Sequence, residues 1–194
     1  MYSPRNQTYQ TDQATPFSLN ARVAFNARDN APDDLTMRAE YINPFLSSLS
    51  TTFRTMLSIE VSRGEMWLKQ DSAPLHEVSG VIGLSGKAVG SVVLSLSGEL
   101  AKKAASHMLM AEIDEVNDDV TDAVGELANM VAGAAKAQLE ELEMSVSLPN
   151  VITGTNYHVR FPSDVKPICI AFSTDWGPLV LEVGLTPAAV PVGA

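Results

Sequence analysis

The stretch that decides the fold is residues 120–142, VTDAVGELANMVAGAAKAQLEEL, which carries the strongest helical pattern in the chain. At about 100° per residue, its apolar side chains form one stripe along a helix. The stripe comprises Val120, Val124, Leu127, Val131, Ala134, Ala135 and Leu142. We expect this side to be buried against a sheet, and the side chain of Asp118 or Asp119 to cap the start of the helix.

The opposite side of this helix combines polar groups with small residues. Glu126 and Asn129 are three residues apart, so their side chains are neighbours on this outer face, which also includes Asp122. Gly125 and Gly133 lie within the helix, where each glycine costs about 1 kcal/mol relative to alanine. Two interpretations remain open: a solvated polar stripe, or a surface shaped for close approach by another protein.

The sequence on either side predicts further helices and a sheet. Residues 37–58 have a helical apolar stripe, and because proline is disfavoured inside a helix we expect the helix to start near Pro44. Ser97 is a candidate N-cap for a helix over residues 98–110. Alternating apolar residues predict strands around Met66 and Leu68 and at residues 78–84, 88–96, 145–148, 157–161, 167–173 and 179–185. This order predicts an α/β (α+β) fold. A mainly antiparallel sheet would have two long helices and a shorter one packed on one face.

Length and composition indicate one folded domain with a tail. The chain has 194 residues, of which 45% are hydrophobic and 19% charged, enough apolar material for a real core. Residues 1–36 are rich in Asn, Gln, Thr, Ser and Pro, which predicts either a flexible tail or a segment that docks on a partner. We therefore expect a tail over 1–36, a domain over 37–187 and a C-terminal end over 188–194.

Charge and cysteine content exclude several classes of function. With 23 acidic and 13 basic residues, the net charge of −10 makes binding to nucleic acid or to an anionic membrane unfavourable. The single cysteine, Cys169, excludes an internal disulfide framework. The sequence has neither an apolar run of about 18 residues nor a secretory signal pattern. We expect a cytoplasmic protein.

The sequence contains segments that resemble metal-binding, phosphate-binding and nucleophile motifs, but each lacks a residue or spacing that the motif requires. Residues 80–88 superficially resemble a phosphate loop, but the glycine spacing is one too long, and Ala88 replaces the residue that would bind magnesium. The acidic residues 114–119 lack the central glycine of a calcium loop, and the three histidines have no ligand spacing. Cys169 lies in an apolar run and is interpreted as a small buried hydrophobe. We predict no metal site.

Residues 122–133, DAVGELANMVAG, match the D-x-x-x-E-x-x-N-x-x-x-G signature of the CheC/CheX phosphatases of bacterial chemotaxis. The flanking segments YINPF (41–45), SGVIG (79–83) and GSVVL (90–94) resemble the CheX branch. The resemblance covers residues 37–187, and the single complete signature is more similar to CheX than to two-copy CheC.

This resemblance implies dephosphorylation of a CheY-type response regulator. It implies that Glu126 pairs with a lysine of the regulator, while Asn129 orients the attacking water. Asp122, Gly125 and Gly133 would contact the partner. The phosphoaspartate and a divalent cation would belong to the regulator, so no cofactor of the chain's own is expected.

The resemblance also implies a homodimer joined through sheet strands. The alternative function is a non-catalytic module that binds response regulators, or an adaptor of the chemotaxis and flagellar switch type. One departure concerns residues 40–44, where Glu40 and Asn43 repeat the spacing but Pro44 follows and the later glycine is missing. We interpret Asn43 as a structural cap or turn residue and Glu40 as solvated.

Overall fold

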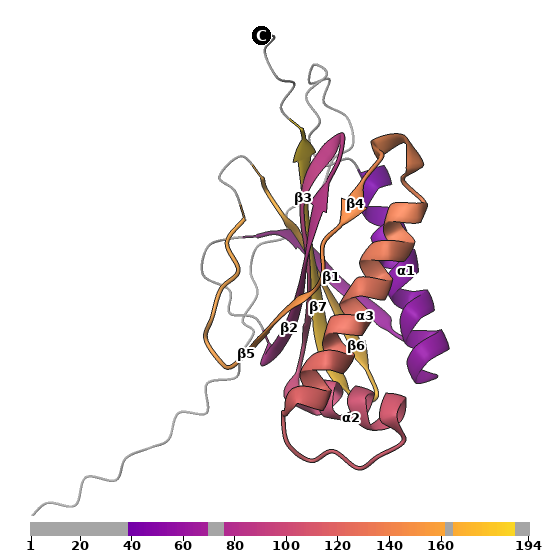
Figure 1. The fold of residues 1–194 in the computed structure, drawn as a ribbon, viewed down its shortest axis with the longest axis vertical. Coiled ribbons are helices and arrows are strands. Elements are labelled where there is room, and N and C mark those ends of the chain that lie inside the picture. The colour runs from indigo at the N-terminus through magenta and orange to yellow at the C-terminus, as the bar shows by residue number, and fades with distance from the viewer. Residues whose placement is uncertain (1–38, 70–75, 162–164, 189–194) are drawn as a thin grey trace, which may run out of the picture. The chain divides into compact units, whose positions relative to one another are not determined.

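Seven strands and three α-helices form the part of the chain that the computed structural model describes, residues 39–69, 76–161 and 165–188. The expected tail over residues 1–36 lies outside the described residues, as do residues 189–194 of the expected C-terminal end. The described elements form one sheet with helices on one of its faces (Figure 1).

All strand pairings in this sheet are antiparallel, and the strand order is β1–β6–β7–β3–β2–β4, with β5 also paired to β2. The strands are β1 Ser62–Leu68, β2 Val78–Ser85, β3 Ala88–Leu96, β4 Ser145–Val146, β5 Asn150–Thr153, β6 Ile168–Thr174 and β7 Gly177–Pro187. Gly86 and Lys87 turn the chain between β2 and β3, as predicted, with Gly86 at a φ of +150°.

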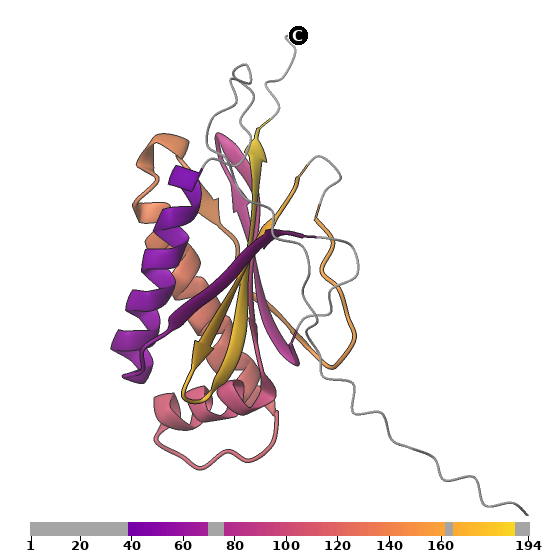
Figure 2. The same ribbon diagram turned by 180° about the vertical axis from the view of Figure 1, so that it is seen from behind.

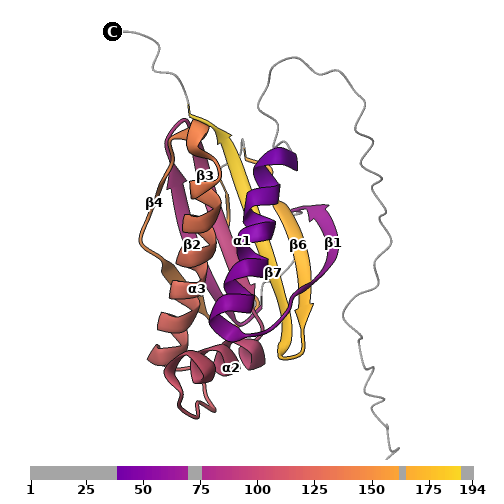
Figure 3. The same ribbon diagram turned by 90° about the vertical axis from the view of Figure 1, so that its right-hand side faces the viewer.

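Two long helices, α1 (Ala39–Leu57) and α3 (Asp118–Ala137), lie side by side on the same face of the sheet (Figures 2 and 3). The shorter α2 (Gly98–Leu109) lies at one end of the sheet, against α3 and β7. Ser97 caps α2 by accepting a hydrogen bond from the Leu100 N–H at 3.4 Å. The predicted fold class and the Ser97 cap are confirmed.

Several local predictions are wrong. Residues 157–161 form no strand, whereas β5 was not predicted. The α3 helix ends at Ala137, and a short 3₁₀ turn, η1 (Glu140–Leu142), follows it. Pro44 and Asn43 both lie inside α1, so Asn43 is an exposed helical residue and not a cap or turn; the side chain of Glu40 is outside the described residues.

The core fills the space between the two long helices and the sheet. α1 contributes Ile42, Phe45, Leu49, Phe53 and Leu57, all of them buried. Each such large apolar side chain stabilises the fold by about 1.5–3 kcal/mol on burial. Among the described helices, none has the length and apolar character that crossing a membrane requires.

Candidate functional site

The candidate site lies on α3, which the fold holds at its start and along its length. Asn117 caps the helix, its Oδ1 accepting a hydrogen bond from the Val120 N–H at 3.1 Å; the prediction that Asp118 or Asp119 is the cap is wrong. These two carboxylates instead lie in the first turn, where they suit the positive end of the helix dipole. Along the helix, Val124, Leu127 and other residues of the apolar stripe are buried against the sheet, with the exception of the exposed Ala134 at its edge.

Glu126 and Asn129 lie on the outward side of α3. Glu126 is exposed, and so is Asp122 one turn before it, while Asn129 is half-buried. Within the described part of the chain, the side chains of Glu126 and Asn129 make no hydrogen bond or ion pair. Both groups are therefore available to another molecule, and the predicted outward placement of the pair is confirmed.

The two glycines of the signature differ in their surroundings. At Gly133, an added Cβ would meet no atom within 4 Å, so the surface beyond Asn129 is open, as expected. Gly125 is buried, because an added Cβ would lie 3.3 Å from Val151 Cγ2 and 3.5 Å from Pro149 Cγ. The prediction that Gly125 lies on the outer face is therefore wrong. The reason is that Pro149 and the β5 residue Val151 cover this side of the helix, so a side chain at residue 125 would require Val151 to shift by a few tenths of an ångström.

The charge on this face is negative. Asp118, Asp119, Asp122 and Glu126 are all exposed on the first half of α3. At i and i+4, Asp122 and Glu126 repel each other slightly when no partner is present. A cationic group of a partner would relieve this repulsion, so the face favours a positively charged ligand surface.

Among the described residues, two other kinds of candidate centre, a metal cluster and a reactive cysteine, find no support. They contain no group of three or more His, Cys, Asp or Glu side chains that could hold a metal ion. Cys169 is buried, with its Sγ 3.6 Å from Glu182 Oε1, and burial raises the pKa of its thiol well above the usual range. The interpretation of Cys169 as a buried hydrophobe and not a nucleophile agrees with this position.

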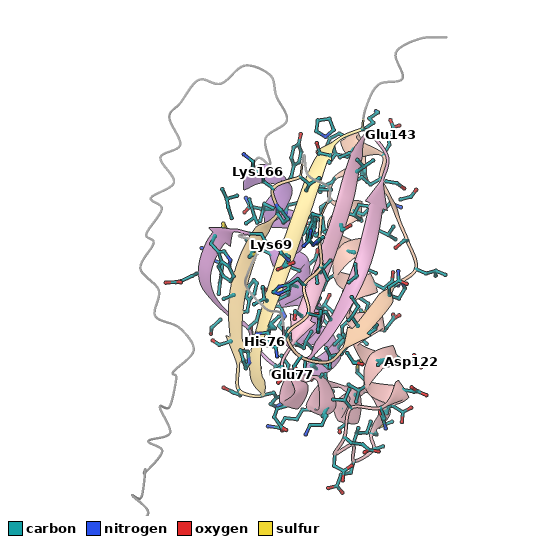
Figure 4. The ribbon with its side chains drawn as sticks, turned by 90° about the vertical axis from the view of Figure 1, so that its left-hand side faces the viewer. Lys69, His76, Glu77, Asp122, Glu143 and Lys166 are labelled. Carbon is teal, nitrogen blue, oxygen red and sulfur yellow. The ribbon has the colours of Figure 1, made fainter. Side chains whose placement is uncertain are left out.

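A polar cluster on the opposite face of the sheet was missed by sequence reasoning. The Tyr157 hydroxyl lies 2.7 Å from Ser79 Oγ and 2.8 Å from the carbonyl oxygen of His76, and burial raises the pKa of Tyr157. Ser79 Oγ in turn lies 2.8 Å from Ser95 Oγ. Figure 4 shows Lys69 and His76 on this face, with Asp122 apart from them on α3. The cluster holds the chain after β5 on the sheet and does not reach the α3 pair.

Comparison with known proteins places this geometry in a family. The family model for the chemotaxis phosphatase CheX matches residues 78–173, which include the whole of α3. The curated CheY-P phosphatase CheX of Thermotoga maritima is 32% identical over 127 residues, which is 64% of this chain and 82% of that protein. The chain belongs to the CheX family.

Solved structures of CheX proteins share its fold. The chemotaxis protein CheX from Vibrio vulnificus is 34% identical, with a TM-score of 0.70 over 76% of this CheX-family chain and 99% of that one. The CheX of a CheX–CheY–BeF3–Mg²⁺ complex from Borrelia burgdorferi is 26% identical, with a TM-score of 0.65 over 77% and 99% of the two chains. The family resemblance inferred from residues 122–133 is confirmed.

Proposed function

We propose that this chain hydrolyses the phosphoaspartate of a CheY-type response regulator, with Asn129 orienting the attacking water and Glu126 pairing with a lysine of the regulator. Membership of the CheX family and the CheY-P phosphatase activity named for the Thermotoga relative support the reaction. The roles proposed for Glu126 and Asn129 are supported by the position of these two side chains. Glu126 and Asn129 lie side by side on the outward side of α3 with no partner in the described part of the chain.

The reaction requires this chain to do little more than position a water molecule. Water attacks the phosphorus, the bond between phosphorus and the aspartyl oxygen breaks, and the products are the aspartate carboxylate and inorganic phosphate. Phosphoryl transfer depends mainly on alignment and on charge stabilisation, and the regulator supplies the phosphoryl group, the divalent cation and the lysine. The carboxamide oxygen of Asn129 would accept a hydrogen from the water and hold it in line, without adding negative charge near the phosphate.

Glu126 and its neighbours would serve docking. A carboxylate 4 Å from a lysine ammonium gains about 1 kcal/mol in water and about 4 kcal/mol at an effective dielectric of 20, so the pair strengthens as the interface closes. Asp122 adds negative potential one turn away, and Gly133 leaves open space for the backbone of the partner. The buried Gly125 would act indirectly, by seating β5 beside the site.

The test is release of phosphate from a phosphorylated CheY-type regulator. Asn129→Ala should reduce the acceleration about 100-fold or more while binding remains measurable, and Glu126→Ala should mainly weaken the complex. Asn43→Ala, at an exposed asparagine on α1, is the matched control and should leave the rate unchanged. If Asn129→Ala keeps full activity, the catalytic group lies elsewhere. Stable binding without faster phosphate release would indicate the adaptor function.

We also propose that the chain acts as a homodimer in the cytoplasm, where its regulator would be. In the described sheet β1 is an edge strand, paired only with β6, and its Met66 and Leu68 are exposed. Such an edge can pair with another strand. A monomeric mass by light scattering would refute the dimer without affecting the proposed chemistry.

A further inference from the structure

The chain between β4 and β5 is firmly attached to the sheet. The Ser147 N–H donates to the carbonyl oxygen of Gly83 at 2.9 Å, and the Gly83 N–H donates to Ser147 Oγ at 2.9 Å. On either side, Val146 pairs with Leu84 and Asn150 pairs with Val81, both in β2. Residues 147–149 are therefore an ordered edge of the sheet with a defined position beside α3.

This edge borders the column of α3 residues that contains Asn129. Pro149 lies against Gly125, since an added Cβ at Gly125 would be 3.5 Å from Pro149 Cγ. Gly125 and Asn129 are four residues apart, so they lie one above the other on the same side of the helix. The chain from β4 to β5 runs opposite to α3 (Figure 1). Leu148, which precedes Pro149, therefore lies on the side of Asn129.

Leu148 is exposed over 87% of its surface although its neighbours are fixed. Isolated exposed leucines are common, so exposure alone indicates nothing. What distinguishes Leu148 is its place, on an ordered edge that flanks the unpartnered Glu126 and Asn129. Ion pairs in water contribute little affinity, whereas apolar side chains near the centre of an interface exclude water and contribute more.

We propose that Leu148 is an apolar anchor that contacts the same response regulator as Glu126 and Asn129. The inference rests on the proposed function and adds a specific contact to it. The surface of the regulator that contacts Leu148 would be an apolar patch beside its lysine, because the Leu148 contact and the Glu126 ion pair must form in the same complex. Burial of Leu148 would also exclude water from the Glu126 pair and so strengthen it.

The test compares Leu148→Ser with a matched control from the same edge. Ile152 is exposed over 37% of its surface, and Val151 beside it faces α3, so by alternation along the strand Ile152 points away from the helix. We expect Leu148→Ser to raise both the Kd for a regulator loaded with beryllium fluoride and Mg²⁺ and the KM for phosphate release about tenfold. The kcat should stay within about twofold, and Ile152→Ser should change none of these quantities.

Each other outcome has one meaning. If the unmodified protein accelerates phosphate release and Leu148→Ser has the same Kd and KM, the anchor is overturned and the proposed function stands. If Leu148→Ser lowers the mass measured by light scattering but binds the regulator normally, Leu148 makes a self-contact and the anchor is overturned. If the unmodified protein neither binds nor dephosphorylates the regulator, the proposed function fails and the anchor fails with it.

Discussion

Ala128 of α3 lies directly over Gly80 of β2, where an added Cβ on Gly80 would stand 2.6 Å from the Cβ of Ala128 and 3.2 Å from the carbonyl oxygen of Val124. Real Cβ atoms do not approach so closely, so the helix reaches this depth only because residue 80 has no side chain. This contact sets the distance of α3 from the sheet and directs the opposite side of the helix, with Glu126 and Asn129, outward.

Replacing Gly80 with valine should therefore destabilise the fold. The added carbon atoms would displace Ala128 and the backbone of α3, and overpacking of this kind typically costs about 1–3 kcal/mol. Urea unfolding measures the change in free energy. Gly133→Ala is the control, since no atom lies within 4 Å of a Cβ added at Gly133. This variant should be as stable as the parent or more stable by up to about 1 kcal/mol. A Gly80→Val variant as stable as the parent would contradict the close contact.

Replacing Glu126 with glutamine should weaken regulator binding and reduce its sensitivity to salt. Loss of one exposed carboxylate is expected to raise KM about five- to tenfold, corresponding to about 1–1.4 kcal/mol, with a smaller effect on kcat. The unmodified complex should weaken as ionic strength rises, because the Debye length is about 10 Å at 0.1 M salt. Glu141→Gln, an exposed acid outside α3, should keep the parental KM and salt slope. Equal slopes for both variants would argue against the lysine pairing.

Replacing Lys69 with methionine should cost about 3–5 kcal/mol of stability, because it leaves the Glu182 carboxylate unpaired. Lys69 Nζ lies 2.5 Å from Glu182 Oε2, and the two side chains are only 11% and 4% exposed. The double change Lys69→Met with Glu182→Leu should recover most of the loss, since it removes both charges. Denaturant midpoints of the single and double variants measure this coupling, and additive losses would disprove it.

Acid should destabilise the protein partly through His76. Burial lowers the pKa of His76 in the fold, with Glu77 acting in the opposite direction. In the unfolded chain the His76 imidazole has its ordinary pKa of 6.5, so as the pH falls it takes up its proton before the folded protein does. The contribution of neutral His76 to the free energy of unfolding is therefore complete above pH 6.5 and is lost as the pH falls below it. His76→Gln should flatten the fall in the free energy of unfolding between about pH 7 and 5. A His76→Gln variant whose free energy of unfolding falls as steeply as that of the parent between these pH values would contradict this contribution.

Local patterns were sufficient for much of the fold. The apolar stripe of residues 120–142 predicted a helix buried on one side, and α3 is buried along that side. Gly86 and Lys87 predicted the turn between β2 and β3, because glycine adopts the positive φ that the turn requires. The spacing of Glu126 and Asn129 placed both on the outward side of the helix, since helical geometry alone determines which residues are neighbours.

The sequence by itself thus determined the elements and the outward pair, because periodicity, turn residues and helical spacing act over a few neighbouring residues. Only the tertiary structure decided that β5 pairs with β2 and covers Gly125, that Pro44 lies inside α1, and that Leu148 flanks the site. These features depend on contacts between segments far apart in the chain. A four-residue strand such as β5 is stabilised by its pairing with β2 and its packing on α3, which no local pattern encodes.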